Sequence, residues 1–151
     1  MLGTENLIKI IVISPDLLMM EFLQSILDSD KFVVETINPA KESITSIRKT
    51  NPDLFIIDDS DSGESILSTC QMIRQYSGMP IMVLSSQRKS GLLEQTLDAG
   101  ADEFLIKPIP GSVLTAHLNT LARRALAEKE AALSIVNGDK ENPNHLGLLA
   151  Y

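Results

Sequence analysis

The sequence predicts an α/β domain in which one sheet of five parallel strands is covered by helices on both faces. Two observations lead to this fold class. Five short apolar runs recur along the chain with similar gaps, and the segments between them carry apolar residues at helical spacing. Short β-α-β units require parallel strands joined by right-handed crossovers, so this alternation predicts a doubly wound sheet in three layers.

The five apolar runs are the expected strands. They are LIKIIVI at 7–13, FVVETI at 32–37, DLFIID at 53–58, PIMVLS at 80–85 and DEFLIK at 102–107. The first, third and fourth are almost continuously apolar, which is typical of strands that are covered on both faces. The second and fifth contain more polar residues, as edge strands can. In such a sheet a ligand site forms at the carboxyl ends of the central strands.

Segments with helical spacing lie between the strands. Asp16 is placed to cap a helix over residues 17–30, which carry a broad apolar stripe. Residues 65–76 place apolar side chains four and three apart, and residues 92–101 end at Gly100, a residue type expected just past a helix. The predicted order is therefore a strand followed by a helix, five times over.

The last helical segment is unusually long, because no Gly or Pro interrupts it between Ser112 and Gly138. Its apolar residues approximate a seam with spacings of four and three, interrupted by one charged residue. We expect Leu114 to Leu121 to pack on the sheet and the remainder to be a solvated extension, with a dimer contact or a connector helix as the alternative. The polar NGDKENPN run that follows predicts a linker. We divide the chain into a domain at 7–127 and a helical extension with linker and tail at 128–151.

Composition argues against several functional classes. The 151 residues are 44% hydrophobic and 22% charged, so the chain can bury a core without metal or disulfide. A net charge of −7 disfavours direct binding of nucleic acid or anionic lipid. No apolar run reaches the roughly 18 residues of a membrane span. With a single cysteine, Cys70, and no signal-like start, we expect a reducing, cytoplasmic setting.

The sequence lacks the common enzyme motifs. No Gly-rich dinucleotide loop follows the first strand, and the chain has no GxxxxGK phosphate loop and no Cys or His cluster with metal-binding spacing. We therefore expect a protein that is not an enzyme. A small-molecule enzyme is retained as a third option only because a fold does not determine a function.

Three side chains of complementary chemistry close three of the predicted strands. Asp58 closes the third strand, Ser85 the fourth and Lys107 the fifth. Because parallel strands end at one rim of the sheet, we expect a carboxylate, a hydroxyl and an ammonium group to meet there. Each residue alone has an ordinary explanation, as a solvated strand end, a hydroxyl bound to backbone or a surface lysine. Their joint placement favours a functional site.

The segments PDLFIID, PIMVLSS and AGADEFLIKPI, together with the order of strands and helices, resemble the receiver domain of bacterial two-component response regulators. The resemblance covers about residues 7–127 and implies a flavodoxin-like sheet of order 2-1-3-4-5. It implies that Asp58 accepts a phosphoryl group from a histidine kinase or phosphotransfer protein, and that Ser85 and Lys107 contact this group. It also implies that Phe104 repacks on activation and that the peptide bond after Lys107 is cis.

The end of the first strand departs from this family. Where the family usually has two adjacent acidic residues that hold Mg²⁺, this chain has Ser14 and Pro15. Mg²⁺ prefers six oxygen ligands with carboxylate charge among them. Each missing unit charge is worth up to roughly 4 kcal/mol at 4 Å with an effective dielectric constant near 20. The resemblance implies Mg²⁺ with Asp58 as a ligand, and the charge count predicts that binding is weak.

Three other carboxylates lie near the implied metal site. Alternation along the strand sends the side chain of Asp59 to the opposite face. Asp16 follows the two positions of the implied acidic pair by one residue and is placed to cap a helix. Asp61 lies in the loop after the third strand. We rank all three below a simpler arrangement, in which Asp58 forms an ion pair with Lys107 in a pocket largely free of metal.

Two hypotheses of different class follow. In the first, phosphorylation switches the binding of a downstream effector protein or of an attached output domain. In the second, the chain is a pseudo-receiver that acts as a protein-protein interaction module without phosphorylation. The intact Asp58, Ser85 and Lys107 favour the first, and the Ser14 and Pro15 pair favours the second. A homodimer is compatible with both.

Overall fold

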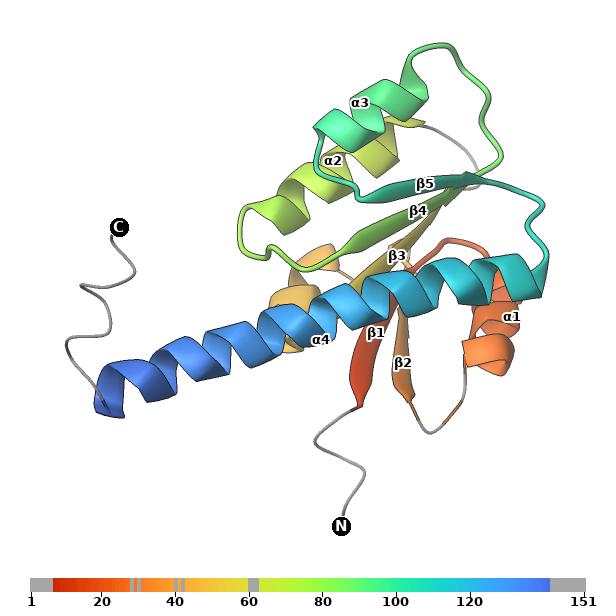
Figure 1. The fold of residues 1–151 in the computed structure, drawn as a ribbon. Helices are drawn as coiled ribbons and strands as arrows, with labels where there is room; N and C mark the ends of the chain where they lie inside the picture. Colours follow the sequence, from red (N-terminus) through yellow and green to blue (C-terminus); the bar gives the residue numbers. More distant parts are fainter. Residues whose placement is uncertain are drawn as a thin grey trace.

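One parallel sheet lies between two layers of helices in the computed structural model of the chain (Figure 1). The structure describes residues 7–141 except 28, 30, 40, 42 and 60–62. The strands are β1 (Ile8–Ile13), β2 (Phe32–Ile37), β3 (Leu54–Asp59), β4 (Ile81–Ser85) and β5 (Glu103–Ile106). They lie in the order β2-β1-β3-β4-β5 and all are parallel, which confirms the predicted topology. Each strand lies within one residue of its predicted bounds.

Helices connect the strands with one exception to the prediction. The helices are α1 (Leu17–Leu27), α2 (Gly63–Arg74), α3 (Leu92–Asp98) and α4 (Gly111–Glu141), and the connection between β2 and β3 contains a short 3-10 helix, η2 (Ile44–Lys49). The prediction of an α-helix after every strand is therefore wrong at η2. Its first two residues are β-branched, which disfavours an α-helix, and Asn51 soon follows in the left-handed region with φ of 49°.

Alternation along the strands produces two separate cores. Ile56 of β3 packs in a cluster with α1 and with Leu118 of α4, on one face of the sheet. The next residue, Ile57, packs in a second cluster with Ile66 of α2 and with η2, on the opposite face. Figure 1 shows α1 and α4 on one side of the sheet and α2 and α3 on the other. Successive residues of a strand thus enter different cores, which decides where the polar strand ends point.

Helix α4 is longer than the face it covers. Its buried side chains are Leu114, Leu118, Leu121 and Ala125, and residues 130–135 are exposed. The expectation of a packed part and a solvated extension is confirmed, but packing continues beyond Leu121 to Ala125 and the partly buried Leu126.

The helix continues through Gly138 to Glu141, so the predicted linker at residue 137 is wrong in its first five positions. A single glycine weakens a helix by only about 1 kcal/mol, and α4 tolerates it. The rest of the predicted linker and the tail lie outside the described residues. Among the helices described, none combines the length and apolarity that a membrane span requires.

Candidate functional site

Asp58 forms an ion pair at the carboxyl rim of the sheet. Its side chain is fully buried, and it lies one residue before the end of β3. Lys107, directly after β5, donates from Nζ to Oδ1 of Asp58 over 2.5 Å. Ser14, directly after β1, donates from Oγ to Oδ2 over 2.8 Å. The predicted pairing of Asp58 with Lys107 is confirmed, and both oxygens of the carboxylate are engaged.

Backbone hydrogen bonds hold the two partners of Asp58 in place. The amide of Ser14 donates to the carbonyl of Ile37 over 3.0 Å, and the amide of Lys107 donates to the carbonyl of Ser85 over 2.8 Å. The Lys107–Pro108 peptide bond is cis, as the resemblance implies. Asp16 caps α1, because its Oδ1 accepts a hydrogen bond of 3.0 Å from the amide two residues later. Asp16 therefore serves the helix, as predicted.

Ser85 is hydrogen bonded to Asp59 and not to Asp58. Its Oγ donates to Oδ2 of Asp59 over 3.2 Å, and both residues are buried. The two residues are neighbours in the register of β3 and β4. Ser85 continues the series that contains Val83, which faces α2, whereas Asp58 continues the series that contains Ile56, which faces α1 and α4. We expected the side chains of Asp58, Ser85 and Lys107 to meet, but only Asp58 and Lys107 are in contact.

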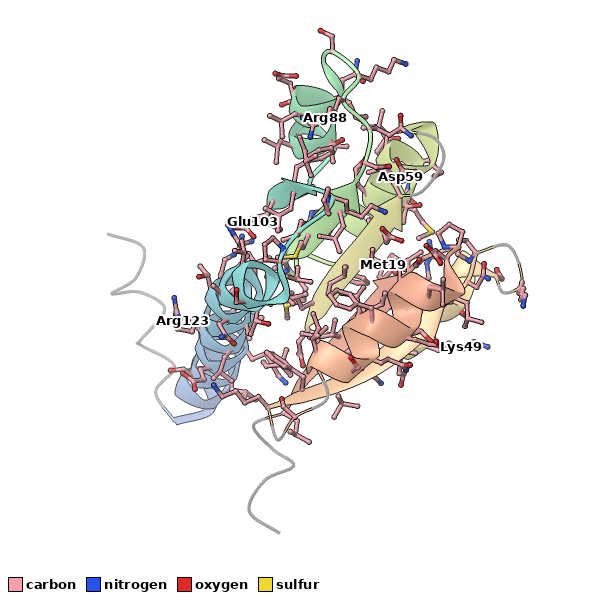
Figure 2. All side chains as sticks on the ribbon, turned by 90° about the vertical axis from the view of Figure 1, so that its right-hand side faces the viewer. Met19, Lys49, Asp59, Arg88, Glu103 and Arg123 are labelled. Atoms are coloured by element: carbon pink, nitrogen blue, oxygen red, sulfur yellow. The ribbon has the colours of Figure 1, made fainter. Side chains whose placement is uncertain are left out.

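Asp59 lies where the alternation rule predicts, on the face opposite to Asp58, and Figure 2 shows it at the end of β3 near α2. Phe104 is on this face too, partly buried against the α2 cluster.

Ser86, which we did not predict, is exposed and lines a groove of about 420 Å³ together with Lys107. The role of Ser14 as a hydrogen-bond donor to Asp58 was also missed. Side chains alternate between the two faces of a strand, and the apolar pattern of each strand already indicated the face on which each of these residues lies.

The described residues around Asp58 do not fit a Mg²⁺ site. Its two oxygens face a hydroxyl and an ammonium group, and neither supplies the further carboxylate charge that Mg²⁺ prefers among its ligands. Pro15 has no side-chain ligand and is exposed. In the part of the chain that the structure describes, no group of three or more His, Cys, Asp or Glu side chains could hold a metal ion. The predicted substitute Asp61 lies outside the described residues.

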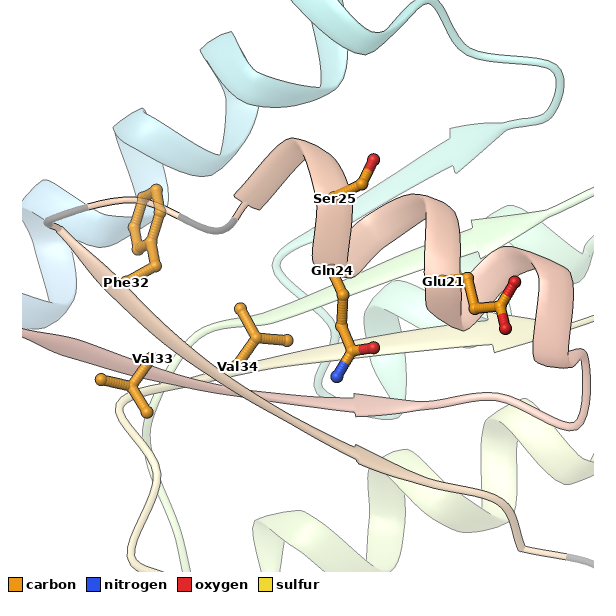
Figure 3. A pocket seen from close by; sticks show the side chains of 6 residues that line it. All are labelled: Glu21, Gln24, Ser25, Phe32, Val33 and Val34. Carbon is orange, nitrogen blue, oxygen red and sulfur yellow. The ribbon is translucent and has the colours of Figure 1, made fainter.

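Neither the hollow beside α1 nor the single cysteine adds to this site. A hollow of about 610 Å³ lies between α1 and β2 (Figure 3). Its lining residues are Glu21, Gln24, Ser25, Phe32, Val33 and Val34, and none of them is a predicted site residue. Cys70 is fully buried, and burial raises the pKa of its thiol to about 11. At neutral pH it is a neutral core side chain and not a nucleophile.

Comparison with known proteins identifies the family. Residues 10–119 match the family model of the response regulator receiver domain. The chain belongs to this family. It is 28% identical over 137 residues to the DNA-binding response regulator MtrA of Mycobacterium leprae (strain TN), covering 91% of this chain and 61% of that protein. It is 30% identical over 115 residues to the transcriptional regulatory protein CseB of Streptomyces coelicolor, covering 76% of this chain and 49% of that protein. The chain thus spans less than two thirds of the length of these relatives.

Solved structures agree on the fold. A two-component response regulator from Clostridium difficile has a TM-score of 0.70 at 24% identity, covering 78% of this chain and 97% of that chain. A response regulator from Thermotoga maritima has a TM-score of 0.69 at 22% identity, covering 78% of this chain and 98% of that chain. The protein is a receiver domain of the two-component type, a class of signalling domains in which phosphorylation of an aspartate is a general property. Receiver domains also generally bind Mg²⁺ in an acidic pocket, and Ser14 and Pro15 mark where this chain departs from them.

Proposed function

We propose that this receiver domain accepts a phosphoryl group on Asp58 from a histidine kinase or phosphotransfer protein, and that phosphorylation changes the binding of an effector. The observation that supports this proposal is the buried carboxylate of Asp58, which has the ammonium group of Lys107 on one oxygen and the hydroxyl of Ser14 on the other. A carboxylate is the nucleophile that such a transfer needs, and a cation beside it offsets the charge on the phosphoryl oxygens.

In the proposed step one oxygen of Asp58 attacks phosphorus. The P–N bond to the donor histidine breaks, a P–O bond to Asp58 forms, and the released imidazole takes up a proton. Each oxygen of Asp58 accepts one hydrogen bond, which lowers its nucleophilicity, so attack is easier from the oxygen whose partner is more readily displaced. Breaking a hydrogen bond from the neutral Ser14 hydroxyl requires less energy than separating the buried ion pair with Lys107. We therefore assign the attack to Oδ2, with Lys107 remaining on Oδ1.

The effector is proposed to bind near β5 and α4. Phe104 of β5 lies on the face of Ser85, and α4 extends beyond the sheet with exposed residues at 130–135. The relatives MtrA and CseB are named as a DNA-binding and a transcriptional regulator, and both are longer than this chain. We infer that the effector here is a separate protein or an attached output domain. The net charge of −7 favours a protein over DNA as the direct partner of this domain.

Intact mass spectrometry tests the proposal. The protein is incubated with acetyl phosphate, with and without Mg²⁺, and its mass is measured. We expect an adduct of one phosphoryl group that is lost in Asp58→Asn and retained in Asp59→Asn, a matched control at the neighbouring carboxylate. Absence of the adduct at high Mg²⁺ would contradict the proposal and favour a pseudo-receiver that signals by binding alone.

A further inference from the structure

Asp59 is a buried acid that the proposed phosphoryl transfer does not use. Only 3% of the residue is exposed, although it lies at the end of β3 next to Asp58. Its Oδ2 accepts the hydrogen bond of 3.2 Å from Ser85, and Asp59 takes part in a further interaction as well. A buried carboxylate is retained only where its surroundings compensate for lost hydration, so its presence calls for an explanation.

We propose that Asp59 is a positioning residue that restrains the hydroxyl of Ser85, so that the Asp59–Ser85 hydrogen bond must break before Ser85 can donate to a phosphoryl group on Asp58. This inference rests on the proposed function, because it assigns Ser85 a role in that transfer. Strand alternation places the Ser85 hydroxyl on the face opposite to the Asp58 carboxylate, and the hydrogen bond to Asp59 holds it there.

The hydrogen bonds around Ser85 determine where its proton points. The amide of Gln87 donates to Oγ of Ser85 over 3.0 Å, so this oxygen already accepts one hydrogen bond. The single hydroxyl proton is donated to Asp59. A serine hydroxyl has one proton, so it cannot donate to Asp59 and to a phosphoryl oxygen at once. The two anions therefore compete for the same donor.

The strength of this competition follows from the geometry. A hydrogen bond to a charged acceptor corresponds to about tenfold or more in an equilibrium constant. The length of 3.2 Å is beyond the usual range for O–H···O bonds, so the lower end of that range applies here. We expect the restraint to slow phosphoryl uptake by about tenfold.

Phosphorylation rates in a double-mutant cycle test the proposal. Uptake from acetyl phosphate is followed by mass spectrometry in the full chain, in Asp59→Ala, in Ser85→Ala and in the double variant. Removing the negative charge of Asp59 helps an anionic donor equally whether or not Ser85 is present. Only the effect of the restraint requires Ser85. The difference between the effects of Asp59→Ala with and without Ser85 therefore measures the restraint. We expect Asp59→Ala to raise the rate about tenfold more when Ser85 is present than when it is replaced.

A conservative variant guards against misfolding. Asp59→Asn keeps the size of the side chain and one acceptor oxygen, so it is expected to raise the rate by an intermediate amount and to remain folded. It replaces Asp59→Ala in the cycle if the smaller side chain prevents folding.

Each outcome of the cycle is decisive. Uptake by the unaltered protein with equal effects of the Asp59 substitution in both backgrounds would overturn the restraint and leave the proposed function intact. A rate that does not respond to Ser85→Ala in the Asp59→Ala background would also overturn it, and would leave the exposed Ser86 beside Lys107 as the hydroxyl that contacts the phosphoryl group. No uptake in any variant would overturn the proposed function, and the restraint with it.

Discussion

Replacing Lys107 with Met tests how much the buried ion pair contributes to stability. The side chain of Asp58 is fully buried and that of Lys107 is 15% exposed, and their charged atoms are 2.5 Å apart. With an effective dielectric constant near 20, unit charges at this distance attract by about 7 kcal/mol. Loss of hydration offsets much of this attraction, so the pair itself adds little net stability.

Removing one partner has a larger effect than the net value of the pair, because it leaves the other charge buried and unpaired. This penalty is about 3–5 kcal/mol for a buried ion pair. Ser14 still donates one hydrogen bond to Asp58, so we expect Lys107→Met to lower the free energy of unfolding by about 3 kcal/mol. The free energy of unfolding of a domain is about 5–15 kcal/mol, so the Lys107→Met variant is expected to remain folded.

The assay is urea unfolding followed by circular dichroism at neutral pH. The double variant with Asp58→Asn contains no unpaired charge, so we expect it to be more stable than Lys107→Met alone by about 1–2 kcal/mol. Lys89→Met is the matched control, because Lys89 is exposed and its substitution is expected to change stability by less than about 0.5 kcal/mol. If Lys107→Met and Lys89→Met have equal effects, or if the double variant is no more stable than Lys107→Met, the ion pair does not have the assigned role.

Three further predictions concern the metal site, α4 and the core. Ser14→Asp combined with Pro15→Asp is expected to strengthen Mg²⁺ binding relative to the unaltered chain, measured by isothermal titration calorimetry; no gain would contradict the charge argument. Arg124→Ala breaks the ion pair of α4 with Asp102 and is expected to reduce the free energy of urea unfolding by only about 0.5–1 kcal/mol, because the arginine is 45% exposed. Burial raises the pKa of the Cys70 thiol from 9.0 to about 11, so the folded state holds its proton more tightly than the unfolded state does. Stability is therefore lost as the pH rises from 9 toward 11, by up to about 2–3 kcal/mol, and urea unfolding of Cys70→Ala should show a smaller loss.

The sheet could be predicted from the sequence because its central strands are buried on both faces. All six residues of β3 are buried, and the continuous apolar run of its first four residues has few alternatives. The connection before β3 was predicted less well. Whether residues 44–49 form an α-helix or a 3-10 helix depends on small differences in local geometry, which apolar spacing does not report. The end of α4 was missed for a related reason, since one glycine weakens a helix without ending it.

The sequence was enough to predict that the candidate site lies at the strand ends. Predicting the contacts within it also required knowing to which face of the sheet each of these side chains points. Every second residue of a strand lies on the same face of the sheet. Extending this rule from the buried residues places Ser14, Asp58 and Lys107 on the face of α1 and α4. It places Asp59 and Ser85 on the opposite face. We applied this rule to Asp59 and not to Ser85, and the hydrogen bond between them was missed.

The same alternation between faces bears on the proposed switch. A phosphoryl group on Asp58 would extend past the strand ends, where the sheet no longer separates its two faces. In the proposed switch the hydroxyl of Ser85 reaches it there, once the hydrogen bond to Asp59 is broken. Phe104 lies on the face of Ser85, so in the proposed switch movement of this hydroxyl would carry the change from the Asp58 side of the sheet to the side of α2. The adjacent acids Asp58 and Asp59 thus link the proposed chemistry on one face to the proposed response on the other.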